Sequence, residues 1–62
     1  MKEVSTILFK DAESDEEIVA IVRRDDRRVA LCVSLRSGAD VEVIISNEDA
    51  EKLIEALKKA VD

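Results

Sequence analysis

The stretch Ile18–Leu35, IVAIVRRDDRRVALCVSL, decides the fold of this chain. Two apolar runs, within predicted strands over residues 17–24 and 27–36, face each other across a charged tip that is nearly symmetric about Asp25-Asp26. Runs of this length, rich in β-branched residues and separated by turn-forming aspartates, are typical of a β-hairpin. We expect this hairpin to form the middle of a small sheet.

The turn predicts a pairing register for the hairpin. If Asp25-Asp26 is a two-residue turn, Arg24 pairs with Arg27, and alternate side chains of both strands share one face. We call this the first face. It is predicted to hold Ile18, Ala20, Val22, Val29, Leu31 and Val33.

Two further strands flank the hairpin. Residues 3–10, EVSTILFK, predict a strand with apolar side chains on both sides, so either side could face inward. Residues 11–16, DAESDE, predict an acidic connection. The only glycine, Gly38, predicts a three-residue loop over residues 37–39, followed by a strand over residues 41–46.

The last part of the chain predicts an amphipathic helix. Ser46 is the expected N-cap, with Asp49 three residues later as an approximate capping box. Acids occupy the first turn and lysines the last, which matches the helix dipole. The apolar stripe of this helix comprises Ala50, Leu53, Ile54, Leu57 and Val61.

These elements predict a single small α+β domain over residues 1–62. Its sheet is a four-stranded antiparallel meander (β-β-β-β-α), with one C-terminal helix packed on one sheet face. The helix stripe is expected to lie over Leu31, Val33, Val43 and Ile45. A chain of 62 residues is marginally stable on its own. Since one cysteine cannot form an internal disulfide, association or regular packing must supply the remaining stability.

The opposite side of the sheet, the second face, is predicted to carry an apolar centre with a polar rim. That pattern is typical of a contact surface. Association through it, most simply as a two-fold homodimer, competes with a monomer that leaves it exposed and with coverage by the first strand or acidic loop. Cys32 is expected near this interface as a small buried apolar residue. The predicted interface is Val19, Ile21, Ala30, Cys32 and Ile44.

The charged tip has two interpretations. It is either a solvated hairpin end or an anion-binding spot for phosphate or carboxylate groups, for which arginine is well suited. The net charge of −5 disfavours nucleic acid, and Phe9 is the only aromatic side chain available for stacking on bases. The candidate anion-binding residues are Arg23, Arg24, Arg27 and Arg28.

No residue pattern in the sequence indicates a catalytic site, a cofactor site or a metal site. Histidine is absent, and no nucleophile has a recognisable base or phosphate-binding glycine loop. Asp11, Glu13 and Asp15 alternate as at the start of a calcium loop, but Glu16 stands where such a loop needs glycine. No leader or membrane-length apolar run occurs, so we expect a cytoplasmic protein with no membrane partner.

The element order resembles the single-strand-binding coactivator and whirly-type proteins, a resemblance that implies dimerisation and nucleic-acid binding on a curved sheet. The chain also resembles an idealised designed α+β protein. Histidine, glutamine, proline, tryptophan and tyrosine are absent, and the tail EKLIEALKKAVD consists of strong helix formers.

Three functional hypotheses follow from the sequence. The leading one is a non-enzymatic structural or interaction module that binds itself, or another protein, through the second face. The first alternative is a single-stranded nucleic-acid or anion binder that uses the arginine tip. The second alternative is a designed protein without a selected biochemical function.

Overall fold

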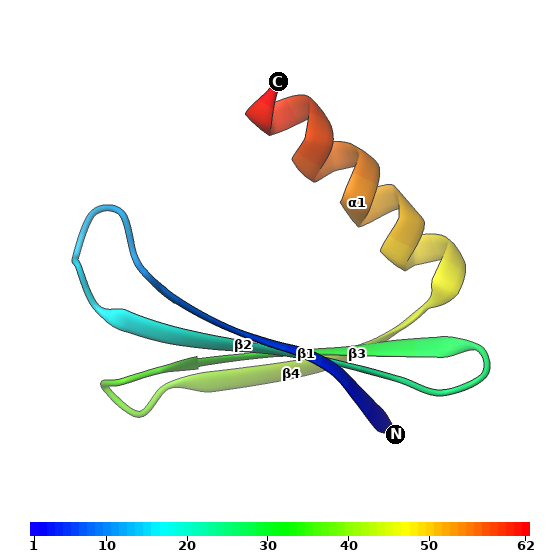
Figure 1. The fold of residues 1–62 in the computed structure, drawn as a ribbon, viewed down its shortest axis with the longest axis horizontal. Coiled ribbons are helices and arrows are strands. Elements are labelled where there is room, and N and C mark those ends of the chain that lie inside the picture. The colour runs from blue at the N-terminus through cyan, green and yellow to red at the C-terminus, as the bar shows by residue number, and fades with distance from the viewer.

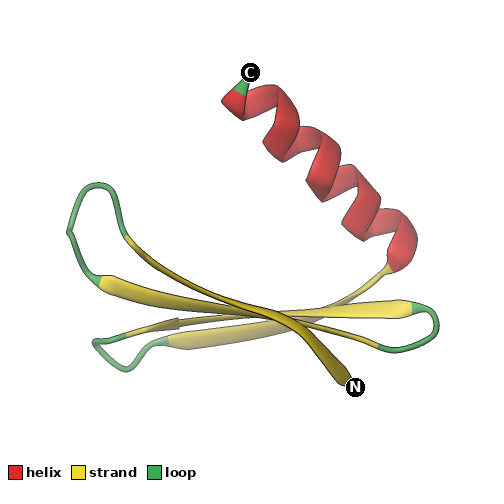
Figure 2. Cartoon of the chain, viewed as in Figure 1, coloured by secondary structure: helices red, strands yellow, loops and turns green.

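The chain folds into one sheet and one helix. The computed structural model describes all residues from 1 to 62. The four strands pair in sequence order as an antiparallel meander, and the helix follows the last strand, which confirms the predicted α+β architecture (Figures 1 and 2). The elements are β1 (Lys2–Lys10), β2 (Glu17–Arg24), β3 (Arg28–Leu35), β4 (Asp40–Ser46) and α1 (Asn47–Val61).

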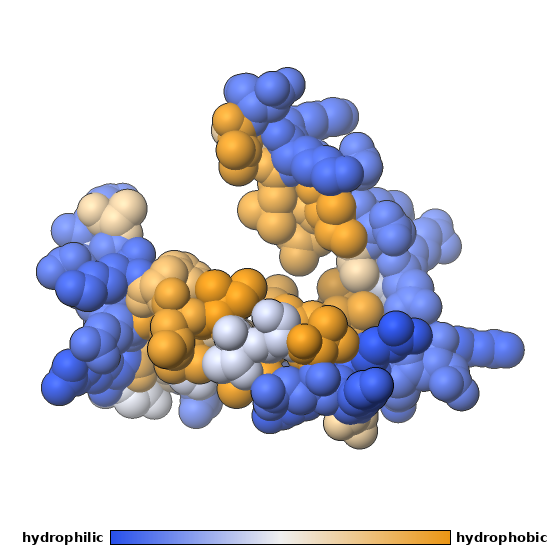
Figure 3. Space-filling model, viewed as in Figure 1, coloured by the Kyte–Doolittle hydropathy of each residue, from blue (hydrophilic) through white to orange (hydrophobic).

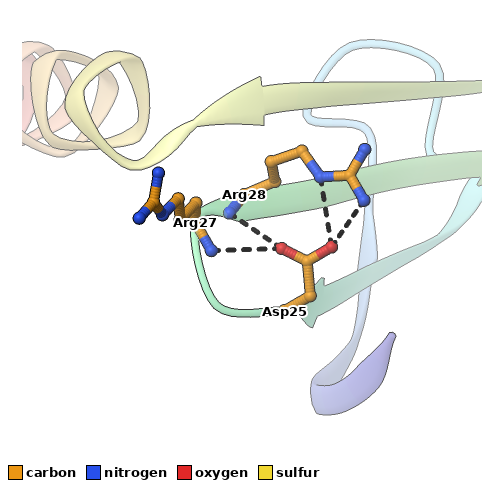
Figure 4. Close-up of polar contacts among 3 residues, drawn as sticks. All are labelled: Asp25, Arg27 and Arg28. Carbon is orange, nitrogen blue, oxygen red and sulfur yellow. Dashed lines mark hydrogen bonds and ion pairs between the residues drawn. The ribbon is translucent and has the colours of Figure 1, made fainter.

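The β2–β3 turn lies one residue later than its predicted centre. Asp25 initiates the turn, because its Oδ1 accepts backbone N–H bonds from Arg27 at 3.2 Å and from Arg28 at 3.0 Å (Figure 4). The Asp25 N–H donates to the Arg28 carbonyl at 3.1 Å, so Asp26 and Arg27 are the central residues. The predicted pairing of Arg24 with Arg27 is therefore wrong, and Arg24 pairs with Val29.

The β3–β4 loop has the predicted length but begins one residue earlier. The Leu35 N–H donates to the Ala39 carbonyl at 2.7 Å, and this bond encloses residues 36–38. Gly38, at φ 105°, is thus the third loop residue, the position that requires positive φ in this hairpin. Both register corrections equal two residues, so every side chain stays on its predicted face.

The β1–β2 connection is organised by Asp11. Its carboxylate oxygen Oδ1 accepts the backbone N–H groups of Glu13 at 2.8 Å and Ser14 at 2.9 Å. These bonds lower the pKa of Asp11, because they favour its charged form. Beyond this turn, Ile7 pairs with Ala20 and Phe9 with Ile18, which places the apolar Ile7 and Phe9 on the first face.

Helix α1 starts without a linker. Ser46 is both the last residue of β4 and the N-cap, and its Oγ accepts the Asp49 N–H at 3.0 Å, as predicted. The helix contacts the sheet only at β3 and β4. From there it rises away from the sheet, and its C-terminal end stands clear of all four strands (Figure 1).

The molecule has a very small interior. Only three side chains are buried: Ile18 and Ala20 on the first face, and Ala30 on the second. The accessible surface is 5135 Å², whereas a folded monomer of 6.9 kDa exposes about 4,000 Å². The radius of gyration is 12.6 Å, whereas a compact chain of this length has about 10.6 Å. The single chain therefore leaves much of its apolar surface open.

Candidate functional site

The first face is the larger apolar surface of the molecule. The strand register brings twelve apolar side chains together on it, and most of them are half-buried or exposed. Apolar atoms cover the side of the sheet that faces α1, and open space separates them from the helix (Figure 3). The twelve residues are Ile7, Phe9, Ile18, Ala20, Val22, Val29, Leu31, Val33, Leu35, Val41, Val43 and Ile45.

The stripe of α1 is the second open apolar surface. Its exposure rises along the helix, from 42% at Leu53 to 58% at Leu57 and 86% at Val61. The stripe points toward the sheet, as Figure 3 shows by the apolar atoms on that side of the helix. The predicted contact of the helix with the sheet is thus confirmed, but it involves only β3 and β4, and Val43 on β4 stays exposed.

The second face carries the five residues predicted to form an interface. Ile21 pairs with Cys32, and Ala30 pairs with Ile44, so the two pairs lie side by side at the sheet centre. Val19 lies on the same face but pairs with Ser34, whereas the predicted pairing of Arg24 with Arg27 would set it opposite Cys32. The structure brings the five together, and their role as an interface stays a prediction.

An ion pair crosses the centre of this second face. Arg23 on β2 and Glu42 on β4 reach toward each other across β3, with Arg23 Nη1 and Glu42 Oε2 3.0 Å apart. Ala30 on the intervening strand is only 2% exposed. The second face therefore covers part of its own apolar centre with charged side chains, whereas the first face has no comparable cover.

The arginine tip is divided by its internal contacts. Asp25 Oδ2 accepts from Nε of Arg28 at 3.1 Å and from Nη2 at 2.6 Å (Figure 4). The Arg28 guanidinium, followed by the Arg27 backbone N–H, lowers the pKa of Asp25, and the same carboxylate raises the pKa of Arg28. Arg23 pairs with Glu42, so only Arg24 and Arg27 lack an ion pair.

These four arginines do not converge on one point. Arg23 pairs with Ala30 and belongs to the second face, whereas Arg24 pairs with Val29 and belongs to the first. Arg27 lies in the turn itself. An anion at the tip would therefore meet at most two uncommitted guanidinium groups that project from different parts of the hairpin.

The largest hollow of the surface does not resemble a ligand pocket. It has a volume of about 610 Å³ and lies between the N-terminus and the β2–β3 turn. Its lining has one apolar residue, whereas small-molecule pockets are mostly apolar. No group of three potential metal ligands converges anywhere, and α1 is too short and too polar to cross a membrane.

The open surface made by α1 and the first face was not predicted as a site. The sequence does show the helix stripe, but it predicts that the stripe packs on the sheet of its own chain. Because both sides of β1 carry apolar residues, the sequence also does not predict that Ile7 and Phe9 belong to the first face. The amphipathic pattern of the helix and of the sheet predicts that the helix stripe packs on an apolar sheet face. It does not predict whether that face belongs to the same chain or to a second copy.

Comparison with known proteins finds no matching family model, no matching curated protein and no matching solved structure.

Proposed function

We propose that this chain is a non-enzymatic interaction module whose working form is a self-associated assembly, most simply a homodimer. The observation that carries the proposal is the accessible surface of 5135 Å². It exceeds the roughly 4,000 Å² of a compact monomer of this mass by about 1,100 Å². A domain with three buried residues has too little core to offset its conformational entropy, and association supplies the missing burial.

The composition of the open surface supports the same proposal. Monomeric proteins seldom expose contiguous apolar patches larger than a few hundred Å². Here the exposed large apolar side chains come from β1, β4 and α1, and Ile7, Phe9, Val43 and Leu53 are among them. A surface of this kind is removed from water either by a partner or by aggregation.

The molar mass in solution tests the proposal. Light scattering coupled to gel filtration, or sedimentation equilibrium, is expected to give twice the chain mass of 6.9 kDa at micromolar protein. Dilution should shift the mass toward one chain, since a dimer dissociates by mass action. A mass of 6.9 kDa throughout the accessible concentration range, together with cooperative unfolding, would contradict self-association.

The anion-binding alternative is supported by Arg24 and Arg27, the two arginines of the tip that form no ion pair. Labelled single-stranded DNA, titrated at low salt, tests it against a variant in which both residues are changed to Glu. Binding by the parent chain that the double variant loses supports the alternative. Absence of binding at micromolar protein excludes it.

A further inference from the structure

The two open apolar surfaces of the molecule, the first face and the α1 stripe, border the same space (Figure 3). We propose that a second copy of this chain occupies this space, so that the α1 of each copy packs its stripe on the first face of the other. This inference rests on the proposed self-association and names the surfaces that make it.

The chain cannot easily close the space by itself. The direction of α1 is set where it leaves β4, because Ser46 serves both elements and no loop residue intervenes. The Asn47 N–H still donates to the Arg27 carbonyl of the neighbouring hairpin at 3.3 Å. Ser46 has φ −68° and ψ 159°, and its side chain caps the helix. Lowering the helix onto its own sheet would disrupt the cap and this backbone bond between the helix start and the β2–β3 turn.

The exposed area fits a second copy. The excess of about 1,100 Å² over a compact monomer is the area that each chain needs to bury. Two chains that bury this area together form an interface of about 2,200 Å², which lies in the range of stable homodimers. One partner of the same size is therefore enough to account for the open surface.

Self-complementarity also favours a second copy over an unrelated partner. Each chain offers one apolar helix stripe and one apolar sheet face, and each surface is what the other needs. In a two-fold dimer, a contact from helix to sheet occurs twice, once in each direction. One two-fold rotation therefore covers both the helix stripe and the first face of each chain. An unrelated protein would have to supply a helix and a sheet face in the same arrangement.

The second face is the competing surface, and isoleucine positions separate the two. Ile7 and Ile18 lie on the first face, whereas Ile21 and Ile44 lie on the second. A chain with labelled isoleucine methyl groups is mixed with an unlabelled Cys32→Ala, Lys58→Cys chain that carries a nitroxide at position 58 of α1. Only contacts between copies broaden methyl signals in this mixture.

Stronger broadening at Ile7 and Ile18 than at Ile21 and Ile44 is the expected result. Stronger broadening at Ile21 and Ile44 would overturn the inference while leaving self-association intact. A mixture that contains only monomers would overturn both. The two failures are therefore distinguishable in one experiment.

A substitution in α1 gives a second test. Leu57→Glu is expected to reduce the mass from two chains to one, because Leu57 is 58% exposed and far from its own β1 and β2. Lys59→Gln is the matched control, since it changes the net charge by the same amount on the opposite side of the helix and should leave the dimer intact. A Leu57→Glu chain that remains dimeric would overturn the proposal.

Discussion

The two faces of the sheet differ in how they treat their apolar residues. The second face has six apolar residues, the five predicted ones and Leu8, which pairs with Val19, and the ion pair of Arg23 and Glu42 crosses this face over Ala30. The first face has twelve apolar residues and no cross-strand ion pair, and the helix that should cover it stands away. The difference shows that the second face covers part of its own apolar centre with charged side chains, whereas most of the first face stays open.

The hairpin ends show a second difference, between abundant local polar contacts and sparse tertiary burial. At the β2–β3 turn, one carboxylate satisfies two backbone N–H groups and an arginine side chain. At the opposite end of the sheet, the Ser37 N–H donates to Glu16 Oε1 at 2.8 Å, and Arg36 pairs with Glu17 at 3.3 Å. Local polar contacts thus define the strand pairing well, while tertiary burial is sparse.

The largest expected effect compares two isoleucines on the same strand. Ile18→Ala should lower the free energy of unfolding by about 2–4 kcal/mol, because Ile18 is buried on the first face. Ile21→Ala on the half-buried second face should cost about 1 kcal/mol. Urea unfolding at equal chain concentration measures both. Equal losses would indicate that the second face is buried in the assembly after all.

The next effect concerns the junction between sheet and helix. Ser46→Ala should cost about 1 kcal/mol, because the Asp49 N–H loses its acceptor at the helix start. Thermal unfolding followed at a helix-sensitive wavelength measures the loss. Ser37→Ala in the exposed β3–β4 loop is the control and should change stability by less than about 0.5 kcal/mol. Similar losses for both serines would contradict a role for the cap.

A smaller effect is expected at the ion pair on the second face. A double-mutant cycle of Arg23→Met and Glu42→Gln should give a coupling energy of about 0.5 kcal/mol that weakens with salt, because both side chains reach solvent. A coupling of several kcal/mol that salt does not change would mean that a partner desolvates the pair. That result would move the interface to the second face.

The smallest effect is the acid response of the β2–β3 turn. The folded-state pKa of Asp25 lies below its ordinary value of 3.8, so the turn gains stability from the ionised carboxylate above that pH. This contribution should decline as pH falls below 3.8 toward the lowered pKa. Carboxyl NMR shifts follow the titration, and Asp25→Asn should remove this part of the acid dependence. An Asp25 titration midpoint at or above 3.8 would contradict the geometry.

Much of the fold could be predicted from local patterns. β-Branched alternation placed the strands, and the sequence from Ser46 to Asp49 placed the helix start. The register was wrong by two residues because side-chain chemistry decided the turns: Asp25 caps backbone N–H groups, and Gly38 takes the loop position with positive φ. The predicted assignment of side chains to the two faces is nevertheless correct, since a register shift of two residues leaves each side chain on the same face.

By itself, the sequence determined which side chains share a face, where the helix begins and that the single cysteine cannot form an internal disulfide. These properties follow from periodicity, capping and composition, which act over a few residues. Only the tertiary structure decided that α1 stands away from the sheet and that the first face stays open. That outcome depends on the direction in which Ser46 turns the chain and on the area left uncovered, and neither quantity is local.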